Sequence, residues 1–304
     1  MSLTKLSDLS QLLIDASIKP RLVVAVAADD YVLAAVSEAA SAGYVFPILV
    51  GDADKIKMVI EQNNFVFNQV EIVDESDDDK AVYQAVAYIA EGKADILMKG
   101  LISTGTLLKR VLDKTFNLKA SKVMSHLAFF EMPSQNRVVA VTDAAMNIDP
   151  DLNQKVAIVE NSVSFMRKIG YELPKVAAIA AVEVVNPAMQ ATLDASALTV
   201  MNLRGQIKNC VIDGPLALDN AVSMESAQHK KITSDVAGQA DLLLAPNLDS
   251  GNILYKAFAF IGHSPSAAVI LGAKCPIVLT SRADSPQSKL NSIMLAAAAL
   301  VLKD

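Results

Sequence analysis

The chain has 304 residues, of which 52% are hydrophobic and 20% are charged, so it is long and apolar enough to bury large cores. Its net charge of −6 argues against a nucleic-acid partner, because neutralising a phosphate backbone requires many Lys and Arg on one face. A small anionic ligand is not excluded, since it needs only a few local donors.

The N-terminal segment 1–17 lacks a basic start followed by an apolar core, so it predicts an amphipathic helix and not a signal peptide. The longest apolar run, residues 293–302, is too short to cross a bilayer. We therefore expect a cytoplasmic protein with no membrane partner. Cys210 and Cys275 form no CxxC motif, so we expect reduced core thiols and neither a disulfide nor a zinc site.

Strand-like and helix-like patterns alternate through the first half of the chain. The predicted strands are 21–27, 46–50, 70–73 and 95–98, and the predicted helices are 31–42, 53–62 and 80–91. In the second half we expect strands at 175–182, 241–245, 267–271 and 276–280, and a helix at 154–170. This alternation predicts an α/β fold with a doubly wound, mostly parallel sheet. The loop 147–153 is a candidate connection between two domains.

Ligands of open parallel sheets bind beyond the carboxyl ends of the strands, so polar segments that follow strands are candidate site segments. Such segments are KGLISTGT at 99–106, TDAAMN at 142–147, EVVNP at 183–187, NLDSGN at 247–252 and SRADS at 281–285. They come from both halves of the chain, which favours a shared cleft. No GxGxxG follows the first strand, so a dinucleotide-binding fold of that type is disfavoured.

The segment 99–106 is a candidate anion cradle. Gly100 allows a close backbone approach, Lys99 adds positive charge, and the hydroxyls of Ser103 and Thr104 precede an apolar helical pattern. The GxxxxGK[ST] order of a P-loop is absent. The alternative is that Ser103 only caps the following helix.

Ser281 and Arg282 follow directly on an apolar strand. An arginine there can hold phosphate oxygens through paired, charge-assisted bonds, and a serine hydroxyl can donate to an atom that gains negative charge. The alternative is an ordinary strand end with a surface arginine.

Other candidate groups carry weaker signals. In the run 213–220, DGPLALDN, the Gly-Pro pair predicts a turn, and its two carboxylates lack histidine partners and EF-hand spacing, so no metal site is expected. His126 is a candidate cleft donor or base, whereas His229 is expected in solvent and His263 in a loop. No GxSxG elbow supports an acyl-serine intermediate.

Taken together, these segments resemble the phosphate acetyltransferase and phosphate butyryltransferase family. The strings that carry the resemblance are LMKGLISTGTLL, KVMSHLAFF, VTDAAMNIDP, AVEVVNPAM, DGPLALDNA, VAGQADLLLAPNLDSGNILYK and PIVLTSRADSPQSKLNSI. The strings KGLIST, DGPLALDNA and SRADS are more similar to the butyryltransferase branch. In the acetyl branch the last loop typically begins Ser-Arg-Gly and carries a base, an aspartate, seven positions after the serine. Here Ser288 stands at that position, so the base is Asp284, His126, phosphate or solvent.

The resemblance implies a two-domain, three-layer αβα architecture like that of isocitrate and isopropylmalate dehydrogenases, with an interdomain cleft. We expect the first domain to comprise 1–149 and 270–304 and the second 150–269. It also implies a homodimer or higher homo-oligomer, no tightly bound cofactor and no metal, with coenzyme A and phosphate as substrates.

The activity implied is the interconversion of acyl-CoA plus phosphate with acyl phosphate plus CoA, by direct transfer in a ternary complex. Ser281 would bond the CoA sulfur, Arg282 would hold phosphate, and Lys99, Gly100, Ser103 and Thr104 would bind phosphate or acyl phosphate. The remaining cleft or CoA-binding candidates are Ser125, His126, Asp143, Asn147, Asn252, Lys256, Asp284 and Ser285. The rival readings are an acetyl-specific enzyme, a metal- and nicotinamide-dependent dehydrogenase of the same fold, and a non-catalytic CoA-binding protein.

Overall fold

The computed structural model describes residues 3–281 and 284–302, and the chain divides into two compact units. Unit 1 comprises Met1–Lys5 and Ser121–Pro265, and unit 2 comprises Leu6–Ala120 and Ser266–Asp304. Beyond the first five residues, the boundaries between these units fall after residues 120 and 265, whereas the predicted domain boundaries fall after residues 149 and 269. The domain assignment itself stays a prediction.

Unit 2 contains a mostly parallel sheet whose strand order is β3-β2-β1-β4-β11-β10. Its strands are β1 (Arg21–Ala25), β2 (Phe46–Gly51), β3 (Glu71–Asp74), β4 (Ile96–Lys99), β10 (Ser266–Leu271) and β11 (Ile277–Val278). Neighbouring strands run parallel except β10 and β11, which are antiparallel. Strands β1 and β4 are buried almost throughout, as expected of strands covered by helices on both faces.

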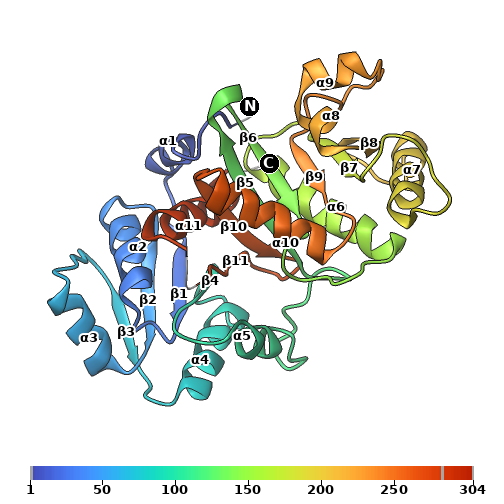
Figure 1. Ribbon diagram of the computed structural model, residues 1–304. Helices are drawn as coiled ribbons and strands as arrows, with labels where there is room; N and C mark the ends of the chain where they lie inside the picture. Colours follow the sequence, from blue (N-terminus) through green and yellow to red (C-terminus); the bar gives the residue numbers. More distant parts are fainter. Residues whose placement is uncertain (1–2, 282–283, 303–304) are drawn as a thin grey trace. The chain divides into compact units, whose positions relative to one another are not determined.

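Two layers of helices cover this sheet, as Figure 1 shows. The helices of unit 2 are α1 (Asp8–Ile14), α2 (Asp30–Ser41), α3 (Ala53–Gln62), α4 (Asp78–Ala90), α5 (Thr104–Val111) and α11 (Pro286–Val301). Helix α11 packs against α1, α2 and β10 on one face, while α4 packs against α5 and strands β1, β2 and β4 on the other. The predicted α/β class is thus confirmed for this unit.

The strands of unit 1 follow one another in the order β5-β6-β9-β7-β8. The strands are β5 (Ser125–Met132), β6 (Arg137–Thr142), β7 (Lys175–Ile179), β8 (Val211–Leu216) and β9 (Leu242–Leu244). Strands β5 and β6 pair antiparallel, and the pairs β6–β9, β9–β7 and β7–β8 are parallel.

The helical segments of unit 1 are η1 (Pro133–Gln135), α6 (Leu152–Lys168), α7 (Gln190–Leu203), α8 (Leu218–Val222), α9 (Met224–His229), α10 (Leu248–Lys256) and η2 (Ala257–Ile261). Helices α6 and α7 pack against each other, and α10 packs against β6. Residues 147–153, the candidate domain connection, lie inside this unit, where Asp151 caps the start of α6.

One local expectation was wrong. The Gly214–Pro215 pair does not form a turn but lies within β8, and its peptide bond is cis. The cause is packing, because a Cβ at Gly214 would stand 2.7 Å from the carbonyl oxygen of Ala178 on the neighbouring strand β7. Tertiary pairing therefore overrides the turn preference of Gly-Pro.

The two cysteines and the long apolar run lie in the packed interior, as expected of core thiols and a packed terminal helix. Both Cys210 and Cys275 are buried and free. Burial raises the pKa of the Cys210 thiol to about 11 and that of Cys275 to about 12. The apolar run 293–302 lies in α11, which packs on the sheet of unit 2. Across 3–281 and 284–302, every helix falls short of the length and apolar character needed to traverse a bilayer.

Candidate active site

The strand order of unit 2 marks one edge of its sheet as a ligand site. The connections from β1 lead to β2 and then to β3, whereas β4 lies on the opposite side of β1. The chain therefore diverges between β1 and β4, and the loops that follow these two strands flank the point of divergence. Open α/β sheets bind ligands at this position.

Gly100, directly after β4, brings the two loops together. Its N–H donates to the carbonyl of Ala25 at 2.9 Å, and Leu101 N–H donates to the carbonyl of Val26 at 2.8 Å. A Cβ at Gly100 would stand 2.1 Å from the Val26 carbonyl oxygen, which leaves no room for any other residue. Val26 itself takes a positive φ of 56°, an uncommon conformation for a β-branched residue. Gly100 therefore makes the expected close approach, and its partner is the backbone of Ala25 and Val26.

Ser103 caps α5, as the alternative reading expected. Its Oγ accepts from Thr106 N–H at 3.1 Å and lies 2.8 Å from Thr106 Oγ1. Thr104 is the first residue of the helix, and both Ser103 and Thr104 are exposed. Capping uses one lone pair of the Ser103 hydroxyl and leaves the helix N-terminus open to solvent, so the cap does not exclude anion binding.

Lys99 lies beneath this loop and not on it. Its side chain is buried, and its ammonium donates to the carbonyls of Gly100 at 3.1 Å and Ile102 at 3.2 Å. The positive charge is therefore held at the base of the 100–104 loop.

The Ser281 segment lies at the same edge of the sheet. Strand β11 pairs in parallel with β4, so the loops after these two strands leave the sheet side by side. Ser281 is exposed, and its backbone N–H donates to Asp284 Oδ2 at 2.6 Å. Asp284 N–H in turn donates to the Ser281 carbonyl at 3.2 Å. Arg282, predicted to hold phosphate, lies outside the described residues.

A second buried lysine supports the Ser281 segment from below. Lys289, in the first turns of α11, is 3% exposed, and its ammonium donates to the Ser281 carbonyl at 2.8 Å and to Thr280 Oγ1 at 3.2 Å. Burial lowers the pKa of Lys289, and the carboxylates of Asp284 and Asp29 oppose that shift. Burial raises the pKa of Asp284, opposed by the bond from Ser281 N–H and by the charges of Lys289 and Lys99.

Ser285 and Ser288 form a hydroxyl cluster at the start of α11. Ser285 caps the helix and accepts from Ser288 N–H at 3.2 Å. Ser288 Oγ, at the position of the acetyl-branch aspartate, also lies 3.3 Å from Ser266 Oγ on β10. A serine hydroxyl is no general base at neutral pH, and the identity of the base stays a prediction.

In unit 1, Asp143 organises the loop that follows β6. Its Oδ1 accepts from the N–H groups of Ala145 at 2.9 Å and Met146 at 3.0 Å, and its Oδ2 accepts from Asn147 Nδ2 at 2.5 Å. Asn147 also donates to the Met124 carbonyl at 2.8 Å. The side chains of Asp143 and Asn147 therefore shape the loop, and their contact with a ligand stays a prediction.

His126 and Ser125 lie at the start of β5 in the same unit. His126 is buried and contacts the edge of the Tyr255 ring, with 5.6 Å between centroids, and its Nδ1 has no hydrogen-bond partner among the described residues. Burial lowers the pKa of His126, and Asp143 opposes this shift. Ser125 Oγ accepts from Asn161 Nδ2 at 3.1 Å.

Helix α10 carries the last two candidates. Asn252 donates to the Ala144 carbonyl at 3.0 Å, and a Cβ at Gly251 would stand 2.1 Å from the Asp143 carbonyl oxygen. The helix thus packs directly on the 143–147 loop, while Lys256 is exposed in its last turn.

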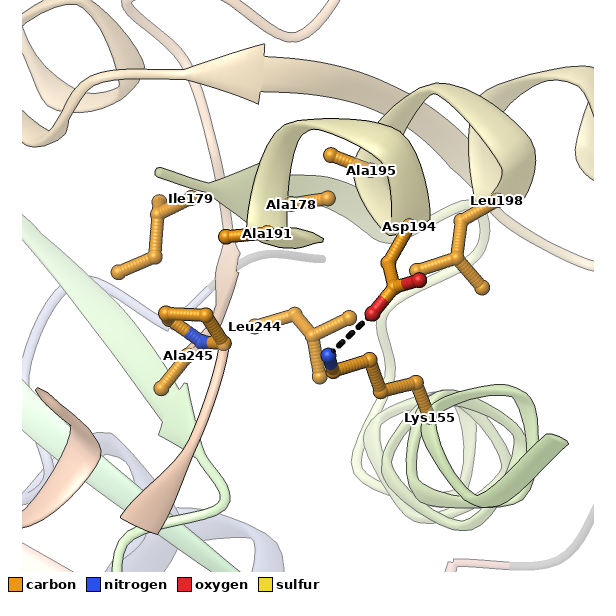
Figure 2. Close-up of a pocket in the computed structure, with 10 residues that line it drawn as sticks. Lys155, Ala178, Ile179, Ala191, Asp194, Ala195, Leu198, Leu244 and Ala245 are labelled. Carbon is orange, nitrogen blue, oxygen red and sulfur yellow. Dashed lines mark hydrogen bonds and ion pairs between the residues drawn. The ribbon is translucent and has the colours of Figure 1, made fainter. Parts of the chain in front are cut away.

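A small, mostly apolar pocket opens elsewhere in unit 1, at the carboxyl ends of β7 and β9 (Figure 2). Lys155 of α6 and Asp194 of α7 point toward each other there and form an ion pair of 2.6 Å with 6% and 10% side-chain exposure. Gln190 Nε2 also donates to Asp194, at 2.8 Å. The ion pair ties α6 to α7.

The structure therefore groups the sequence candidates by unit. In unit 2 it brings together Lys99, Gly100, Ser103, Thr104, Ser281, Asp284 and Ser285. In unit 1 it brings together Ser125, His126, Asp143, Asn147 and Asn252, with Lys256 at the end of the same helix as Asn252. Sequence reasoning missed Asp29, which caps α2, and the supporting role of Lys289. Within 3–281 and 284–302, no cluster of three or more His, Cys, Asp or Glu is placed to hold a metal ion.

The model of the family described as phosphate acetyl/butaryl transferase matches residues 78–297, well over half of the chain. The chain belongs to this family. Among its relatives are a phosphate butyryltransferase from Clostridium acetobutylicum, 48% identical over 91% of this chain and 92% of that protein, and a phosphate acetyltransferase from Thermotoga maritima, 44% identical over 91% and 94%. A solved structure of a branched-chain phosphotransacylase from Enterococcus faecalis superposes with a TM-score of 0.83 at 34% identity, covering 93% of this chain and all of that one. The predicted family and fold class are thus confirmed.

Proposed function

We propose that this transferase moves a short acyl chain between coenzyme A and inorganic phosphate, forming or consuming an acyl phosphate. Family membership supports the reaction class. The observation that carries its location is the parallel pairing of β4 with β11, because it sets the Ser103 and Ser281 segments at one edge of one sheet. The other side of the site, between the two units, stays a prediction.

The acyl chain that we propose is butyryl or a similar short or branched chain. Overall identity does not decide this, because the butyryl- and acetyltransferase relatives differ by only four percentage points, 48% against 44%. The proposal is supported instead by the strings KGLIST, DGPLALDNA and SRADS, and by Ser288 in place of the acetyl-branch aspartate. The alternative is an acetyl-specific enzyme.

The chemistry is direct transfer in a ternary complex. A phosphate oxygen attacks the thioester carbonyl carbon, the carbon–sulfur bond breaks, and CoA leaves as a thiolate that takes up a proton. Catalysis then depends on positioning and charge stabilisation. Ser281 Oγ donates to the sulfur as it gains charge, and Arg282 holds the phosphate. The amides and hydroxyls at the start of α5, with Ser103 and Thr104, bind the phosphate oxygens, and Lys99 adds positive charge from beneath.

The remaining candidates are proposed to bind the CoA portion. Asp284 and Ser285 belong to the loop that carries Ser281, whereas Ser125, His126, Asp143, Asn147, Asn252 and Lys256 belong to unit 1. Asp284 is the better candidate for a base in the reverse direction, because its raised pKa brings it nearer to that of a useful proton acceptor. We also propose a cytoplasmic homodimer or higher homo-oligomer with no tightly bound cofactor.

Initial rates with both substrates varied test the ternary complex. Intersecting lines in double-reciprocal plots are expected, and parallel lines together with a trapped acyl-enzyme would exclude direct transfer. A series of straight and branched acyl-CoAs, followed by thiol release, tests the chain preference. Arg282→Ala should lower turnover at least about tenfold, because it loses a charge-assisted contact worth ~1.5–3 kcal/mol. Unchanged kinetics would remove Arg282 from the mechanism.

A further inference from the structure

Both backbone polar groups of Ser281 are held by charged side chains that follow it in the chain. Its N–H donates to the Asp284 carboxylate at 2.6 Å, and its carbonyl accepts from the Lys289 ammonium at 2.8 Å. Charge-assisted bonds of this kind are about twice as strong as neutral ones. The backbone of Ser281 is therefore fixed while its side chain stays at the exposed surface.

Lys289 differs from a surface lysine in being buried and hydrogen-bonded to the chain around it. It is 3% exposed, and besides the Ser281 carbonyl it bonds Thr280 Oγ1 at 3.2 Å. The carboxylates of Asp284 and Asp29 lie near enough to offset part of the cost of burying its charge. Burying a lysine ammonium costs desolvation free energy, and an apolar side chain of similar size fills the same space without that cost. The buried charge of Lys289 therefore points to a role beyond packing.

We propose that Lys289 is a positioning residue for the transfer reaction: its ammonium clamps the carbonyl of Ser281 from beneath the loop and so fixes the direction in which the Ser281 hydroxyl meets the CoA sulfur. This inference rests on the proposed function of Ser281. Lys289 touches neither substrate, and its effect passes through the loop backbone. The hydroxyl of Ser281 must be in place only while charge develops on sulfur, so loss of the clamp lowers turnover more than substrate binding.

The test variant is Lys289→Met, which keeps the length and apolar stem of the side chain and removes its charge. We expect kcat for phosphate-dependent CoA release to fall at least about tenfold, while KM for acyl-CoA stays within about twofold. Hydrogen exchange at the Ser281 amide, followed in the peptide that contains it, should become faster because the loop loses one of its two anchors. This second readout does not depend on activity.

The pH profile separates positioning from general stabilisation. Among the described residues, Lys289 and Lys99 act electrostatically on Asp284, and Asp29 acts on Lys289. Removing the positive charge of Lys289 raises the pKa of Asp284 further. In the reverse direction, where acyl phosphate acylates CoA and Asp284 is the proposed base, the acid limb of kcat/KM should therefore move to higher pH in Lys289→Met. Lys155→Met combined with Asp194→Leu is the matched control, because it removes a buried lysine charge in unit 1 together with its partner, is expected to be nearly neutral for stability, and should leave the acid limb in place.

The inference is overturned if Lys289→Met keeps kcat within about twofold of the wild type, or if its acid limb and amide exchange do not move. Should that variant not fold, the near-isosteric Thr280→Val decides: a kcat lowered a few-fold at constant KM supports the clamp, and wild-type kcat refutes it. A wild-type protein without phosphate-dependent CoA release would overturn the proposed function itself. An active wild type with an unaffected Lys289→Met would overturn only the role of Lys289.

Discussion

Replacing Gly100 by alanine should damage both the stability of unit 2 and the activity. The added Cβ would stand 2.1 Å from the carbonyl oxygen of Val26 and 2.7 Å from that of Ala25, whereas ordinary contact begins at 3.4 Å. Both neighbours are backbone atoms of the chain that leaves β1, so no flexible side chain can turn away. The 100–104 loop must therefore move away from β1.

The cost follows from the bonds that this movement breaks. Gly100 N–H and Leu101 N–H donate to those same two carbonyls at 2.9 and 2.8 Å, and each buried backbone group left unpaired costs about 1–3 kcal/mol. We expect a loss of about 3 kcal/mol in the free energy of unfolding, which for a unit of this size lowers Tm by about 6–12 °C. Since the loop carries the cap of α5, a displacement of about 1 Å at the proposed phosphate site should lower kcat/KM about 100-fold.

Thermal unfolding and thiol release measure the two effects, and Gly105→Ala is the matched control for stability. A Cβ at Gly105 would meet nothing nearer than Ser103 Oγ at 3.9 Å, and alanine in a helix is favoured over glycine by roughly 0.5–1 kcal/mol. Gly105→Ala should therefore keep or raise Tm. If Gly100→Ala has the same Tm as Gly105→Ala and retains wild-type kcat/KM, the described packing of the Gly100 loop on β1 is wrong.

Two further predictions concern buried charges in unit 1. Lys155→Met should lower the free energy of unfolding by about 3–5 kcal/mol in urea titrations, because it leaves Asp194 unpaired. Lys155→Met combined with Asp194→Leu should be nearly neutral. Equal losses of stability in the single and the double variant would contradict a buried ion pair. Burial, opposed by Asp143, lowers the pKa of His126, so the folded state binds fewer protons than the unfolded state once the pH drops below the unfolded value near 6.5. Stability should then fall as pH drops from about 6.5, by up to ~1.36 kcal/mol per pH unit, and His126→Gln should remove this slope while the exposed His229→Gln keeps it.

The placement of two candidate segments could be predicted because strand ends carry a compositional signal. The apolar runs that form β4 and β11 end at Lys99 and before Ser281, and the polar residues that follow are the ones that the structure sets at one sheet edge. The close approach at Gly100 was also predictable in kind, since only glycine lacks the Cβ that such a contact excludes. What the sequence could not supply was the partner of that contact, the backbone of β1, seventy-odd residues earlier in the chain.

The role of Lys289 could not be predicted for a related reason. Its place in an apolar helix gave no sign that its ammonium reaches back to the Ser281 carbonyl, because that contact depends on how α11 packs on β10 and β11. The Gly214–Pro215 pair is a second example, because its local sequence predicts a turn but pairing with the neighbouring strand places it within β8. Local sequence patterns predict where helices and strands end, whereas tertiary packing determines which of these ends lie close together.

The most direct test of the central claim is product analysis with butyryl-CoA and [¹⁸O₄]phosphate. Direct transfer predicts free CoA and butyryl phosphate in equal amounts, with all four labelled oxygens retained in the acyl phosphate, because a phosphate oxygen itself attacks the thioester. Release of CoA without phosphate dependence, accompanied by butyrate and no acyl phosphate, would contradict it.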